Sequence, residues 1–250
     1  MRKLAILLFL LVSFCTLAQN TNDLFSNANS LYKKGNYEEA IKLYEQIKSQ
    51  NIASSELYYN LGNCYYKLNK VAPTIYNYEK ALKLNPLNED AKNNLVLAKR
   101  LTLDRIEALP KSVLQKFNEN YLQKLAYNTW AIVTVIISFI ASVFFLLFYF
   151  AYTPSKKRLY FTTSIISFLL LIASLIVTYT QYNQSKNTIE AIVFSEVISV
   201  NNEPTNNSDE VFTLHEGTKV LVLDSVDNWK KIKLADGKIG WTQSENLKEL

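Results

Sequence analysis

The stretch LYYNLGNCYYKLNKVAPTIYNYEKALKLNP, residues 57–86, sets small residues among tyrosines and leucines at helical spacing. Small, aromatic and packing positions recur at an offset of 34 residues, in the pairs Ala28 and Gly62, Tyr44 and Tyr78, and Ile47 and Ala81. A 34-residue period is typical of stacked helix-turn-helix units. The pattern therefore favours an all-α solenoid over a pair of ordinary amphipathic hairpins.

The order of residue types within residues 55–88 resembles the tetratricopeptide repeat. It runs Tyr58, Leu61, Gly62, Tyr65, Tyr78, Ala81 and Pro86. Residues 21–54 resemble the same repeat without the closing proline, and a capping helix is predicted at about 89–107, within a repeat region of 19–108. Thr74 stands where the family prefers alanine, which predicts slightly looser packing of that helix.

The resemblance implies a concave face that binds extended peptides or helices of partner proteins. Its side chains would come from the first helix of each repeat. We expect this groove to be lined by Phe25, Asn29, Tyr32, Lys33, Tyr59, Asn63, Tyr66 and Lys67. The two asparagines are placed to hydrogen-bond a guest backbone, but asparagine is common there in the family and does not identify a ligand.

Residues 1–18 have the pattern of a secretory signal peptide. A basic start precedes an apolar run that ends near Phe14, and Ala18 offers a cleavage site. Cys15 leaves a lipoprotein as the alternative, against which the bulky Phe14 argues. After cleavage Cys64 would be the only cysteine, so no intramolecular disulfide could form, and we expect it to behave as a small buried hydrophobe.

Two uncharged apolar runs predict membrane helices at 126–152 and 159–182. Each exceeds the roughly 20 residues that cross a bilayer, and tyrosine or tryptophan flanks both. Two buried core helices are the alternative, but they would need a large soluble domain around them. Because the predicted spans contain no ionisable side chain other than tyrosine, we expect an anchor in the bilayer rather than an ion path.

The predicted loop at 153–158 carries Lys156, Lys157 and Arg158, which favour a cytoplasmic loop. With an exported N-terminus, both end regions would be periplasmic, in a bacterial inner membrane. Residues 109–125 predict a juxtamembrane helix at the membrane interface, with an extension of the solenoid cap as the alternative.

The formal net charge of +5 does not indicate a nucleic-acid partner. It equals the charge of two basic residues in the signal peptide and three in the predicted loop. The remainder is a positive repeat region balanced by a negative C-terminal region, without a basic stripe for phosphates.

Residues 188–250 change to the alternating period of strands, interrupted by turn signals such as HEG and ADGK. This predicts a small all-β barrel. The stretch resembles bacterial SH3 domains through Gly217, Trp229, Gly240 and Trp241. The resemblance implies a module that binds peptides or cell-wall fragments, with Trp229 and Trp241 as groove candidates. We expect at least one of the two tryptophans to be core.

The sequence offers no recognisable catalytic set. His215 and Cys64 lie in different predicted domains, and the zinc-protease, serine-hydrolase and phosphate-loop motifs do not occur in the sequence. We expect neither enzymatic activity nor a cofactor or metal.

The order of these parts, over nearly the whole chain, resembles the E-type proteins of the Bacteroides aerotolerance (Bat) operon. The resemblance implies an inner-membrane component beside other Bat proteins, some with von Willebrand factor A domains, in a periplasmic complex linked to oxidative-stress tolerance or envelope maintenance. We expect a membrane-anchored scaffold for protein partners. The alternative is a cell-wall sensor or tether that binds peptidoglycan through the SH3-like domain.

Overall fold

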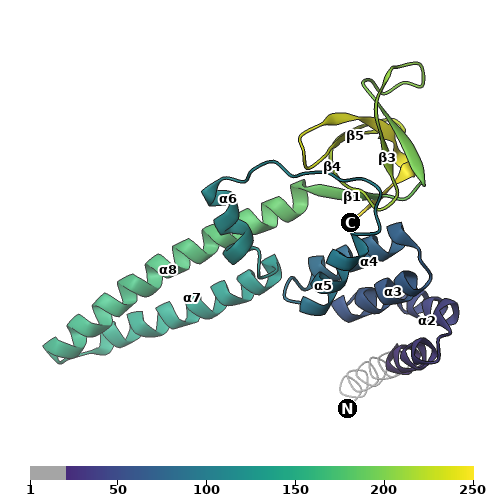
Figure 1. The fold of residues 1–250 in the computed structure, drawn as a ribbon. Helices are drawn as coiled ribbons and strands as arrows, with labels where there is room; N and C mark the ends of the chain where they lie inside the picture. The colour runs from purple at the N-terminus through teal and green to yellow at the C-terminus, as the bar shows by residue number, and fades with distance from the viewer. Residues whose placement is uncertain (1–20) are drawn as a thin grey trace, which may run out of the picture. The chain divides into compact units, whose positions relative to one another are not determined.

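The computed structural model describes residues 21–250, so the predicted signal peptide and Cys15 lie outside the described residues. The chain divides into two compact units (Figure 1). Of the described residues, the first unit contains 21–84, 88–107 and 190–250, and the second contains 85–87 and 108–189. The chain thus leaves the first unit after residue 107 and returns to it at residue 190.

The repeat region of the first unit consists of consecutive helices. They are residues 21–33, α2 (Tyr37–Ser49), α3 (Ser55–Lys67), α4 (Val71–Leu84) and α5 (Glu89–Ala98). The side chain of Ser54 caps α3 by accepting a hydrogen bond from the backbone N–H of Leu57. The turns inside the two hairpins each contain a residue with positive φ, +83° at Gly35 and +55° at Asn69, 34 positions apart.

The helices of the second hairpin, α3 and α4, are in close contact. An added Cβ at Gly62 would lie 2.6 Å from two ring carbons of Tyr78, so only glycine leaves room for that ring. Thr74 is fully buried, as is Ala40 at the equivalent position of the first repeat. The Thr74 hydroxyl donates to the carbonyl of Lys70 at 2.6 Å, which satisfies the extra polar atom inside the hairpin.

The predicted capping helix is shorter than expected. α5 ends at Ala98, and residues 99–112 form turns and irregular backbone. The cause lies in the C-terminal region of the same unit, because Asp104 accepts hydrogen bonds from it and Ile106 packs against its core.

The second unit contains α6 (Val113–Phe117), a π-helical turn η1 (Asn118–Leu122), α7 (Tyr127–Phe150) and α8 (Pro154–Asn187). With 24 and 34 residues, α7 and α8 are long and apolar enough to cross a membrane. At 1.5 Å per residue they measure about 36 and about 51 Å, against about 30 Å of hydrocarbon.

The connection between α7 and α8 is shorter than the predicted loop at 153–158. It comprises residues 151–153, and α8 begins at Pro154, a residue suited to the first helical turn. Lys156, Lys157 and Arg158 therefore lie in the first turns of α8, and the helix continues beyond the predicted end at 182.

The helices α7 and α8 pack through small and polar side chains at seven-residue spacing. These are Thr134 and Ala141 on α7, and Ser167, Ser174 and Gln181 on α8. The hydroxyls of Thr134 and Thr178 lie 3.0 Å apart. Small side chains of this kind allow close approach of two helices in lipid.

The C-terminal region is a seven-stranded sheet. Its strands are β1 (Ile189–Val193), β2 (Val197–Asn201), β3 (Glu210–His215), β4 (Lys219–Val226), β5 (Trp229–Lys233), β6 (Ile239–Gln243) and β7 (Leu247–Glu249). Their order is β3-β2-β6-β5-β4-β1-β7. The all-β prediction agrees with this sheet, but the sheet does not close into the predicted small barrel, because β3 and β7 remain edge strands within residues 189–250 and β7 is only three residues long.

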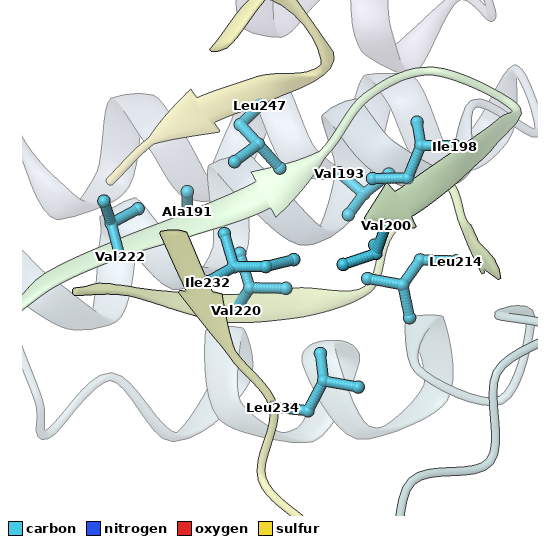
Figure 2. Close-up of a cluster of buried hydrophobic side chains, with 10 residues drawn as sticks. All are labelled: Ala191, Val193, Ile198, Val200, Leu214, Val220, Val222, Ile232, Leu234 and Leu247. Carbon is cyan, nitrogen blue, oxygen red and sulfur yellow. The ribbon is translucent and has the colours of Figure 1, made fainter. Parts of the chain in front are cut away.

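Aliphatic side chains fill the core of the sheet. Figure 2 shows them gathered as one cluster, which comprises Ala191, Val193, Ile198, Val200, Leu214, Val220, Val222, Ile232, Leu234 and Leu247. Trp229 and Trp241 are only half-buried and are not part of this cluster. The expectation that one of them is core is therefore wrong, since valine, leucine and isoleucine already fill the space.

Candidate functional site

The repeat region contains a pocket of about 250 Å³. It is lined by Tyr32, Tyr59, Asn63, Tyr66, Lys67, Tyr78, Asn94 and Leu97. Five of these are among the eight residues predicted for the groove. The pocket therefore lies where the first helices of consecutive repeats present their side chains.

A hydrogen-bond network at Asn63 shapes the wall of this pocket. The Tyr78 hydroxyl donates to Asn63 Oδ1 at 2.7 Å, and Asn94 Nδ2 donates to the same oxygen at 3.0 Å. The first repeat contains an equivalent network, in which Asn29 Oδ1 accepts from the Tyr44 hydroxyl and from Asn60 Nδ2.

These networks limit what the two asparagines can offer a guest. Each carbonyl oxygen already accepts two intramolecular hydrogen bonds. Only the Nδ2 donors remain for a guest backbone, and Asn63, unlike Asn29, lines the pocket.

The pocket combines aromatic surface with hydrogen-bonding groups. Burial is the main cause that raises the pKa of Tyr78 and of Tyr32, so both hydroxyls stay protonated at physiological pH. Among the described residues that line the pocket, Lys67 alone carries a charge. The site suits an apolar or aromatic side chain accompanied by hydrogen-bond acceptors.

Three predicted groove residues lie elsewhere. Phe25 packs with the core of the first repeat, its ring centroid 5.7 Å from that of Tyr44. Asn29 is engaged in the network above, and Lys33 is exposed.

Sequence reasoning missed Tyr78, Asn94 and Leu97 as pocket residues. The repeat offset contained a signal for one of them, because Asn94 follows Asn60 by 34 positions.

A second cluster joins α4 and α5 to the sheet. Ile192 of β1 is fully buried against residues of the repeats, namely Ala72, Ile75, Tyr76, Tyr78, Leu95 and Ala98. The rings of Tyr76 and Phe194 meet edge to face at 5.6 Å, and the Lys248 ammonium lies 4.5 Å from the Tyr76 centroid.

Four charged groups form an ion cluster at this contact. Glu79 of α4, whose side chain is 10% exposed, lies 2.8 Å from Lys99 Nζ and 2.9 Å from Lys219 Nζ. Lys219 also lies 3.0 Å from Glu190. Burial alone would raise the pKa of Glu79, but the charges of Lys219 and Lys99 outweigh it and lower that pKa. Sequence patterns had given no signal for this cluster.

Asp104 makes a further connection to the sheet. Its carboxylate accepts hydrogen bonds from the His215 backbone N–H at 2.8 Å and from the Thr218 hydroxyl at 2.5 Å. His215 Nδ1 lies 2.7 Å from the other oxygen. Burial tends to raise the pKa of Asp104, but the hydrogen bonds from Thr218 and His215 prevail and lower it.

Trp229 and Trp241 lie on the face of the sheet opposite the aliphatic core. In the antiparallel pair β5–β6, Lys231 is opposite Trp241 and Trp229 is opposite Gln243. The Lys231 ammonium lies 5.7 Å from the Trp241 ring centroid. The two tryptophans therefore belong to one half-buried surface.

Cys64 is fully buried in α3, and burial raises the pKa of its thiol to about 12. A thiol of this kind is a poor nucleophile at neutral pH. Within residues 21–250, no group of three or more histidine, cysteine, aspartate or glutamate residues is placed to hold a metal ion.

The comparison with protein families agrees with the helical repeats. The family model described as Tetratricopeptide repeat matches residues 55–88. This confirms the repeat prediction for the segment that contains α3 and α4. None of the curated proteins matches the chain.

Proposed function

We propose that this protein is a membrane-anchored scaffold that binds protein partners in the pocket of its repeat region. The tetratricopeptide repeat supports a role in protein–protein interaction. The observation that carries the proposal is the pocket between α3, α5 and residue Tyr32, whose aromatic and amide side chains come from successive repeats. A catalytic activity is not part of the proposal.

Anchoring in a membrane rests on α7 and α8. Both helices are long, apolar and largely exposed, as expected of helices that face lipid. Because the chain leaves the first unit at residue 107 and re-enters it at residue 190, the repeats and the sheet belong on one side of the membrane. Together with the predicted signal peptide and the basic residues near the α7–α8 connection, this favours the periplasmic side.

The segment of α6 and η1 supports the membrane assignment. Val113 and Leu114 are 83% and 80% exposed, and Phe117 and Tyr121 are also exposed. The segment is tied to the apolar helices, because Trp130 Nε1 donates to the Leu122 carbonyl at 2.8 Å. We infer that this apolar face lies in the lipid headgroup region, as an interfacial helix.

The wider setting that we propose is a Bat-type complex, concerned with aerotolerance or envelope stress, in which other membrane proteins are the partners. Its support is the resemblance in the order of parts along the chain. Within that setting, the protein positions partners without chemical conversion of a substrate.

The alternative is a tether to the cell wall. It rests on the surface that contains Trp229 and Trp241, since tryptophan rings suit stacking on apolar faces of ligands. Retention of the full-length protein on purified cell wall, lost in a Trp229→Ala, Trp241→Ala variant, would support this alternative.

Site-specific photocrosslinking in native membranes tests the scaffold function. A photoreactive phenylalanine analogue at Tyr66 should capture a discrete protein, whereas the same analogue at exposed Lys42 of α2 should not capture it. A Lys67→Ala, Asn63→Ala variant should reduce the capture. Equal capture from Lys42, or capture unaffected by the double substitution, would contradict binding in the pocket.

A further inference from the structure

The solenoid ends in an incomplete repeat. α5 occupies the place of the first helix of a third repeat, but residues 99–112 contain no second helix. A terminal repeat has an apolar face that its neighbours do not cover, so repeat arrays need a cap. Another element must therefore cover α4 and α5.

The covering element is β1. Ala191 and Val193 point into the aliphatic core of the sheet, while Ile192 between them is buried among Ile75, Leu95 and other repeat residues. The strand is thus buried on both faces, and one side chain from the sheet completes the core of the repeats.

The turn at Gly217 adds a second close contact. A Cβ at Gly217 would lie 2.9 Å from Ile75 Cδ1 and 3.0 Å from atoms of Val71 and Thr102. The backbone of this turn, with φ of +84°, therefore lies directly on α4 and on the segment after α5.

The ion cluster specifies how the sheet and the repeats meet. Glu79 and Glu190 carry two negative charges, and Lys99 and Lys219 carry two positive charges, so the cluster is neutral. Ion pairs add little stability, but Glu79 is largely buried, and another docking that kept it buried without its lysines would leave its charge uncompensated. The cluster therefore disfavours any other docking of these surfaces.

We propose that the C-terminal sheet is the cap of the solenoid, in place of the second helix of a third repeat, and that repeats and sheet form one cooperative body. The two parts are separated in the sequence by α7 and α8. Since α5 also contributes Asn94 and Leu97 to the pocket, the sheet holds one wall of that pocket. Only this last consequence rests on the proposed function.

Hydrogen exchange measured by mass spectrometry on the full-length protein in detergent micelles tests the proposal. Ile192→Ser should accelerate amide exchange at least tenfold in α5, although the substitution lies in the sheet. The matched control is Ile239→Ser, in the same sheet at a side chain that is 44% exposed. We expect exchange in α5 of this control to stay within twofold of the wild type.

Faster exchange in β1 with unchanged exchange in α5 would overturn the proposal, because the sheet would then be an independent module. If Ile192→Ser does not fold, Ile192→Val removes a single methylene and should give the same pattern at about threefold. Neither outcome depends on a captured partner, so the capping role and the proposed scaffold function fail separately.

Discussion

Gly62 and Tyr78 show how one residue without a side chain organises the pocket. The ring of Tyr78 lies against the Cα of Gly62, and its hydroxyl reaches Asn63 on the same helix as Gly62. The Tyr78 side chain is thus held at its ring by Gly62 and at its hydroxyl by Asn63, which also accepts a hydrogen bond from Asn94. The contact between α3 and α4 and the position of a pocket residue thus depend on the same atoms.

We predict that Gly62→Ala destabilises the protein by roughly 1–3 kcal/mol, because the new methyl group must displace the Tyr78 ring. The sign of this change in stability is informative, because alanine in place of glycine inside an exposed helix usually stabilises a protein by about 1 kcal/mol. Thermal or urea unfolding measures the effect. A more stable Gly62→Ala variant would contradict the tight contact.

We predict that Asp104 makes the free energy of unfolding depend on pH in the acid range. Its pKa is lowered from the ordinary 3.8, so its contribution is fully present above that value and is lost as pH falls through the lower value in the folded state. We expect the free energy of unfolding to fall more steeply below about pH 4 in the wild type than in Asp104→Asn. Equal slopes in urea titrations of the two proteins would show that the carboxylate is not responsible.

At the scale of elements, the 34-residue offset predicted the hairpins because each repeat buries the same types of residue at the same positions. It also predicted the side of the pocket, since Tyr32 and Tyr66 are equivalent residues of consecutive repeats. Boundaries that depend on another element were not predictable. α5 stops early because Asp104 and the residues around it pack on the sheet.

The sheet illustrates the same limit. Alternation along residues 188–250 indicated strands, but periodicity reports only which face is apolar, not what covers it. Ile192 lies in β1, but its side chain is buried among residues of the repeats. Charged residues at such a contact, Glu79 among them, resemble ordinary surface charges until the partner element is known.

Glu79→Gln tests this contact between elements. The amide keeps the shape but leaves Lys219 and Lys99 without their shared carboxylate, so we expect a loss of about 2 kcal/mol in the free energy of unfolding. Glu38→Gln, on the exposed first turn of α2, is the matched control and should stay within about 0.5 kcal/mol. Combined with Lys219→Met, the loss should be smaller than the sum of the two single losses, because the pair is shared. Strict additivity would contradict a direct interaction.

At the scale of the whole molecule, α7 and α8, which we propose cross the membrane, are inserted between parts of the first unit. The second of them, α8, is separated from β1 by Thr188 alone, and β1 is the strand that covers the repeats. As two membrane spans, these helices would return the chain to the side from which it left. A common side for the repeats and the sheet follows from contacts within the first unit, and depends neither on the predicted signal peptide nor on the basic residues.

Cysteine labelling tests that topology. In a Cys64→Ala background, single cysteines at Ser49, Ser155 and Asn207 lie at exposed positions of α2, the start of α8 and the β2–β3 connection. In spheroplasts, an impermeant thiol reagent should label positions 49 and 207 together and reach 155 only after the membrane is permeabilised. If positions 49 and 207 were labelled on opposite sides of the membrane, the repeats and the sheet would not share a side, and the capping role would be refuted. If position 155 alone were labelled, the common side and the capping role would stand, but the orientation in the membrane would be reversed.

Replacing Lys156, Lys157 and Arg158 with glutamine should raise the fraction of molecules in the reversed orientation, since positive charge next to a short connection is what retains that connection in the cytoplasm.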